Sequence, residues 1–178
     1  MDETKYNFGT FTWRITAAHM ITYFIAGFLA YKLFSYEEVF GTGDMAVLMK
    51  PLDSPWVMAG SALQIFRGIL FGLVLWPFKG VFLESKFGWL KLWGLFIGLA
   101  ILGTAGPTPG SFEGMIYTNF PVLGQITGLH EVVVQTLAFS LLVYYWYKYP
   151  KYIWNILSIV IVTLLLLMII VGLLTTYA

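Results

Sequence analysis

Five long apolar stretches dominate this chain of 178 residues. A helix of about 20 apolar residues crosses the hydrocarbon core of a bilayer, so each stretch predicts one transmembrane helix. The connections between them leave no room for a soluble domain, and residues 1–178 are therefore predicted to form a single membrane-embedded domain. The predicted spans are Phe11–Phe34, Trp56–Phe78, Phe87–Ala105, Gly128–Tyr147 and Ile153–Thr176.

The composition favours the same class. Hydrophobic residues make up 59% of the chain and charged residues only 11%, whereas a typical soluble domain has about 25% charged residues. The predicted fold class is therefore all-α, a polytopic integral membrane protein with five transmembrane helices. Cysteine is absent, which excludes disulfides, iron–sulfur clusters and thiolate metal sites.

The basic residues divide unequally between the two predicted faces of the membrane. Cytoplasmic segments of membrane proteins carry an excess of Lys and Arg, so the N-terminus is predicted to be cytoplasmic and the C-terminus outside. We expect a multi-pass protein of a bacterial cytoplasmic membrane. One face collects Lys5, Arg14, Lys79, Lys86, Lys91, Lys148 and Lys151, and the other collects Lys32 and Lys50 with Glu37, Glu38, Asp44, Asp53 and Glu113.

Two further features concern packing. The spacings Gly68-x-x-x-Gly72 and Gly94-x-x-x-Gly98 predict close helix approach, because small residues let backbones come together. Residues 111–127 are too apolar for a solvated loop and too rich in Gly and Pro for a span. We expect this segment to be re-entrant or interfacial and to form a lid over the outer end, beside the loop Tyr36–Ser54.

Arg67 lies in the middle of the second apolar stretch. A guanidinium in hydrocarbon costs about 2.5–3.5 kcal/mol on insertion scales, so it needs a partner or a wet cavity. Polar side chains on the first, second and fourth stretches follow helical spacing and predict an interior polar pocket. The predicted lining residues are Arg67, Gln64, Glu131, Gln135, His130, Glu113, His19 and Tyr23.

The predicted function is to bind or translocate a small polar or anionic species. Arg67 supplies positive charge, and Glu131 is the expected counter-ion, with Glu113 as the alternative. His130 near the mouth would add pH sensitivity. His19 beside Tyr23 would suit a proton relay. A buried Arg–Glu pair that only fixes helix packing explains the same residues.

Two other functions remain open from the sequence. The small size and the glycine faces suit an accessory subunit of a larger membrane complex or a homo-oligomer. Alternatively, Glu113, His130 and Glu131 could serve as acid/base groups in an enzyme acting on lipid-like substrates. The same three residues could instead form a metal site. No catalytic motif is present, so enzymatic activity stays undecided.

No cofactor is predicted. His19 and His130 differ by about 15–20 Å in depth, too far apart to ligate one haem. The expected partner is the lipid bilayer, and nucleic acid is not expected because the basic residues are sparse and scattered.

Overall fold

The computed structural model describes residues 7–34, 49–102, 106 and 108–177, and helix is the only regular secondary structure in those ranges. The all-α prediction is confirmed. The long helices are α1 (Phe8–Leu33), α3 (Pro55–Leu75), α4 (Gly88–Leu102), α6 (Val122–Lys148) and α7 (Tyr152–Tyr177), and the shorter elements are the 3-10 turn η3 (Trp76–Phe78), the π-helical turn η4 (Gly80–Glu84) and α5 (Phe112–Tyr117).

Three described helical segments are long and apolar enough to cross a membrane, namely Pro55–Phe78, Val122–Lys148 and Tyr152–Thr175. They correspond to the predicted second, fourth and fifth spans, and the fourth begins six residues earlier than predicted. α4 has 15 residues within the described part of the chain, because residues 103–105 of the predicted third span lie outside it. Five spans and the orientation of the termini remain predictions.

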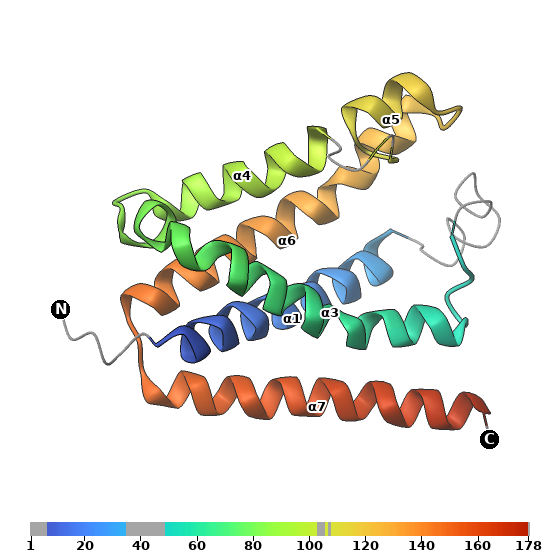
Figure 1. Cartoon of the computed structure of the whole chain (residues 1–178). Coiled ribbons are helices and arrows are strands. Elements are labelled where there is room, and N and C mark those ends of the chain that lie inside the picture. Colours follow the sequence, from blue (N-terminus) through green and yellow to red (C-terminus); the bar gives the residue numbers. More distant parts are fainter. Residues whose placement is uncertain (1–6, 35–48, 103–105, 107, 178) are drawn as a thin grey trace.

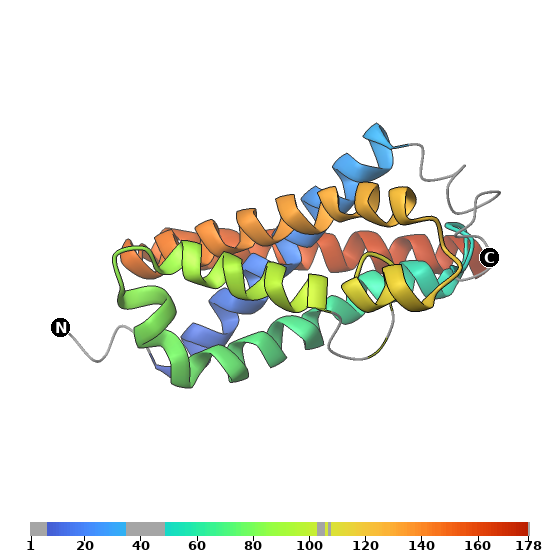
Figure 2. The same cartoon turned by 90° about the horizontal axis from the view of Figure 1, so that it is seen from above.

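α1 is the central helix of the bundle. It packs against α3, α6 and α7, and it crosses α6 and α7 obliquely in the view of Figure 2. α4 and α6 form an upper layer with α5, and α7 lies along the opposite side (Figure 1). α1 buries eleven of its residues, among them Phe11, Ile15, Ala18 and Met20. Because its neighbours are mostly protein, this helix tolerates more polar residues than α7, whose side chains are largely exposed.

Gly68 and Gly72 bring α3 into backbone contact with α1. A Cβ added at Gly68 would lie 2.7 Å from the Cα of Thr16, and one at Gly72 would lie 2.9 Å from the Cα of Thr12. Only glycine allows this approach, so the prediction for this pair is confirmed. The matching prediction for α4 is wrong within the described chain, because a Cβ at Gly94 or Gly98 would meet nothing within 4 Å.

The segment between α4 and α6 is folded against the start of α6 (Figure 1). Ser111 caps α5 by accepting a hydrogen bond from the amide of Gly114 at 2.9 Å. The buried amide group of Gln125 accepts from the amide of Gly110 at 3.2 Å and donates to the carbonyl of Phe120 at 2.8 Å. These bonds tie residues 108–120 to α6 as one unit.

The start of α6 differs from the sequence prediction. α6 begins at Val122 rather than Gly128, because Pro121 occupies the N-cap position, where its missing amide costs no helical hydrogen bond. Arg14 falls inside the predicted first span, and the structure shows its side chain buried in α1. The predicted outer loop Tyr36–Ser54, with Glu37, Glu38 and Asp44, lies mostly outside the described residues, as does Lys5.

Candidate functional site

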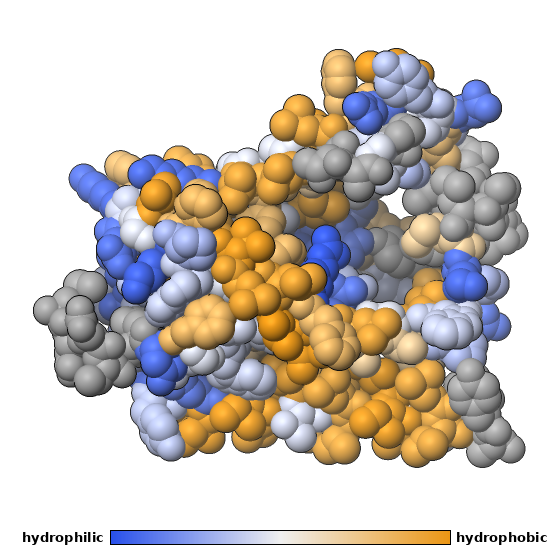
Figure 3. All heavy atoms as spheres, in the orientation of Figure 1, coloured by the Kyte–Doolittle hydropathy of each residue, from blue (hydrophilic) through white to orange (hydrophobic). Residues whose placement is uncertain are grey.

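A cavity of about 460 Å³ lies between α1, α3, α4 and α6. α3 and α4 are joined through η3 and η4 but contact each other little, and α1 and α6 form the cavity floor. Figure 3 shows hydrophilic side chains at a hollow near the middle of this face, next to a band of hydrophobic side chains. The lining residues are His19, Arg67, Phe71, Phe96, Leu99, Ala100, Thr108, Val132, Gln135, Thr136 and Phe139.

Arg67 brings positive charge to this cavity at the middle of its helix. It lies twelve residues after Pro55 and eleven before Phe78, which places it roughly 17–18 Å from either end of that segment. Its guanidinium carbon is 5.7 Å from the centre of the Phe71 ring, a cation–π contact. The neighbouring Gly68, packed on Thr16, fixes the register that brings Arg67 beside α1.

His19 supplies a second polar group from α1. The side chain is only 4% exposed, and its Nε2 lies 3.2 Å from the amide oxygen of Gln64. An amide oxygen only accepts hydrogen bonds, so Nε2 is the protonated nitrogen. Gln64 in turn donates to the carbonyl of Gly60 at 3.3 Å, which fixes the orientation of its amide. Phe71 and Phe139 pack edge-on against the imidazole, with ring centroids 5.0 and 6.0 Å away.

Tyr23 lies one turn further along α1. Its ring centroid is 6.1 Å from that of His19, and Ser61 of α3 lies near its hydroxyl. Tyr23 is within electrostatic range of both Arg67 and Glu131. Polar groups therefore continue from the cavity along the α1–α3 contact towards the C-terminal end of α1.

The predicted direct pairing of Arg67 with Glu131 is wrong. Glu131 lies opposite Gly27, where an added Cβ would be 3.9 Å from its Oε1, whereas Gly68 lies opposite Thr16. Those two levels are eleven residues apart on α1, roughly 16 Å. No carboxylate among the described residues forms an ion pair with Arg67.

Two other predicted residues lie away from the cavity. His130 places its ring against Phe34, at 3.6 Å between centroids, and its Nδ1 contacts the carbonyl of Thr127. Glu113 lies in the first turn of α5 and does not line the cavity. Within the described ranges no three His, Asp or Glu residues could hold a metal ion together, so the suggested site of Glu113, His130 and Glu131 is not formed.

Of the predicted lining residues, the structure brings Arg67, Gln135 and His19 to the cavity wall. Gln64 supports His19 and Tyr23 adjoins it. Sequence reasoning missed Thr136, whose hydroxyl donates to the carbonyl of Val132 at 2.6 Å. It also missed the contribution of α4, because Phe96, Leu99 and Ala100 are apolar and carry no polar signal.

Arg14 forms a separate buried polar cluster that the sequence did not indicate. Its Nε donates to the amide oxygen of Asn155 in α7 at 2.9 Å, and its guanidinium carbon is 5.9 Å from the centre of the Trp146 ring. Trp13 donates to the hydroxyl of Ser158 at 3.1 Å. These bonds join α1 to α7.

Comparisons with protein-family models, with curated proteins and with solved structures found no match. The fold and site therefore define the class of protein only as far as a helical bundle with membrane-compatible helices and a central polar cavity.

Proposed function

We propose that this protein is a five-span membrane protein that binds a small polar or anionic group in the cavity beside Arg67. The N-terminus would be cytoplasmic and the C-terminus outside, as the basic residues predict. α1 would be the span enclosed by the others, which accounts for its polar face. α4 would complete the bundle, its exposed side chains facing lipid.

The proposal depends on the position and surroundings of the Arg67 side chain. It is mid-way along an apolar helix, its side chain is exposed at the cavity, and no carboxylate of the described chain pairs with it. A guanidinium at this depth needs an anion or water to offset the lost hydration. A bound anionic group would supply charge-assisted hydrogen bonds that the described residues do not give to Arg67.

The rest of the wall suits such a ligand. Gln135 and Thr136 of α6 offer hydrogen-bonding groups, and His19 is held in place by Gln64. Phe71, Phe96 and Phe139 form a compact aromatic cluster, with centroid separations of 5.1–6.0 Å, that would contact an apolar part. Binding sites typically combine a few polar groups with such apolar walls.

The packing around the N-terminal half of α1 favours binding over translocation. Phe11, Ile15, Leu75, Leu92 and Val143 belong to one hydrophobic cluster there, and all five are buried. To cross the membrane through the cavity, an ion would need a polar path through this cluster. The polar groups instead continue towards Tyr23, so the ligand would enter from that side or from between α3 and α4.

The test measures anion-dependent stability of the purified protein with chloride, acetate and inorganic phosphate as probes. A ligand at ten times its Kd raises the unfolding free energy by about 1.4 kcal/mol. We expect at least one probe to stabilise the wild type and Lys91→Gln, a charge-matched control on exposed Lys91. Arg67→Gln should lose the effect. If the anions stabilise Arg67→Gln as much as Lys91→Gln, the proposal is refuted. If the wild type conducts anions across proteoliposomes, the function is translocation rather than binding alone.

A further inference from the structure

A second cavity, of about 470 Å³, lies on the other side of the bundle, between α6 and α7. It shares no lining residue with the cavity at Arg67. Its walls are almost entirely apolar and include Leu142, Leu157 and Ile161, with Ile21 of α1 behind them. We call it the α6–α7 groove.

The groove begins at the turn between the two helices and runs along α7. From Lys151 to Ile161 is ten residues, roughly 15 Å along a helix. This is about half the 30 Å hydrocarbon thickness of a bilayer, the depth that one leaflet of acyl chains occupies. An apolar groove of this length matches one acyl chain.

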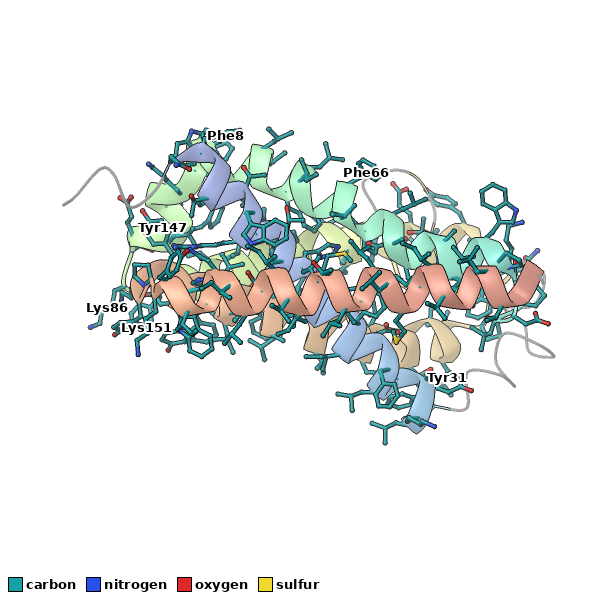
Figure 4. The ribbon with its side chains drawn as sticks, turned by 90° about the horizontal axis from the view of Figure 1, so that it is seen from below. Phe8, Tyr31, Phe66, Lys86, Tyr147 and Lys151 are labelled. Carbon is teal, nitrogen blue, oxygen red and sulfur yellow. The ribbon has the colours of Figure 1, made fainter. Side chains whose placement is uncertain are left out.

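The mouth of the groove has the residues of a headgroup site. Tyr145, Tyr149 and Trp154 line it, and aromatic side chains of this kind prefer the interface between headgroups and hydrocarbon. Lys151 is the charged residue of the lining. Figure 4 shows Lys151 and Lys86 at the same end of the bundle.

Two other charged side chains near this end, those of Lys148 and Glu84, have partners within the protein. Lys148 donates to the hydroxyl of Tyr144 at 2.8 Å, and that hydroxyl contacts the carbonyl of Lys86 at 2.9 Å. The carboxylate of Glu84 accepts a hydrogen bond from Tyr147 at 2.9 Å and does not line the groove. The charge at the mouth is therefore positive.

We propose that the α6–α7 groove binds one acyl chain of an anionic phospholipid whose phosphate is held by Lys151. The apolar wall accepts either a zwitterionic or an anionic lipid, and Lys151 provides the preference for net negative charge. This site is independent of the ligand proposed for Arg67.

The experiment is native mass spectrometry of the full chain in mild detergent with dioleoyl phosphatidylglycerol or dioleoyl phosphatidylcholine. One lysine at a membrane surface contributes enough attraction for about a fivefold preference. We expect that preference for phosphatidylglycerol in the wild type, in Lys91→Gln and in Arg67→Gln. Lys151→Gln should bind the two lipids equally.

A second variant tests the acyl site itself. Leu157 is 41% exposed and lines the groove, so Leu157→Trp fills the space without entering a packed core. It should lose retention of both lipids while keeping the wild-type unfolding temperature. Equal binding of both lipids to the wild type, equal effects of Lys151→Gln and Lys91→Gln, or retained lipid in Leu157→Trp would each overturn the proposal.

Discussion

Replacing Gly68 by alanine tests the contact that positions Arg67. The new Cβ would lie 2.7 Å from the Cα and 3.0 Å from Cγ2 of Thr16. Carbon atoms pack best at about 3.5–4.0 Å, so α1 and α3 would have to separate by about 1 Å. Overpacking of this kind costs about 1–3 kcal/mol. Alanine's better helix propensity returns about 1 kcal/mol, so we expect a net loss of up to about 2 kcal/mol.

The chain contains its own matched control. Gly98→Ala makes the same chemical change in the other glycine pair, where an added Cβ meets nothing within 4 Å. We expect its unfolding free energy to stay equal or to rise by up to about 1 kcal/mol. Equilibrium unfolding in mixed micelles, followed by circular dichroism, measures both variants. The reasoning is refuted if Gly68→Ala is no less stable than Gly98→Ala.

Two further substitutions test buried polar contacts. Gln125→Leu removes the bonds to Gly110 and Phe120, which should cost about 1–3 kcal/mol and speed hydrogen exchange in residues 110–120; unchanged exchange there would contradict the role given to Gln125. Asn155→Leu removes the acceptor for Nε of Arg14, a charged hydrogen bond worth about 1.5–3 kcal/mol, and an unchanged unfolding free energy would show that this bond does not hold α1 to α7.

The helices could be predicted because their signals are local. Apolar runs of sufficient length specified α3, α6 and α7, and the glycine spacing in α3 identified a true close contact. The start of α6 could not be predicted, because Gly124 and Gly128 resemble loop residues. What keeps that turn helical is the buried Gln125, whose partners come from the preceding segment.

The polar site was predicted in part for the same reason. Helical spacing placed His19, Gln64, Arg67 and Gln135 on inward faces, and the structure brings them to one region. A single sequence does not indicate how far α6 is shifted along its axis relative to α1. The predicted pairing of Glu131 with Arg67 is therefore wrong, because Glu131 lies opposite Gly27. The partner of Arg14 could not be predicted, because Asn155 lies 141 residues away in the sequence.

The central claim is that the cavity beside Arg67 is accessible to water and selects anions. The chain has no cysteine, so Thr136→Cys places a single thiol on the cavity wall. Proteoliposomes carrying it are treated with anionic and cationic methanethiosulfonate reagents. A reagent in the cavity would lie about 8 Å from Arg67. At that distance the charge of Arg67 changes the reaction rate of each charged reagent by about twofold or more, even at the dielectric constant of water.

We predict that the anionic reagent reacts about fivefold or more faster than the cationic one, relative to a free thiol, and that Arg67→Gln abolishes the difference. Ala138→Cys, exposed on α6 but outside the cavity lining, should not react with either reagent, because the thiolate does not form in hydrocarbon. An unreactive Thr136→Cys, or equal rates for both reagents with Arg67 present, would contradict the claim.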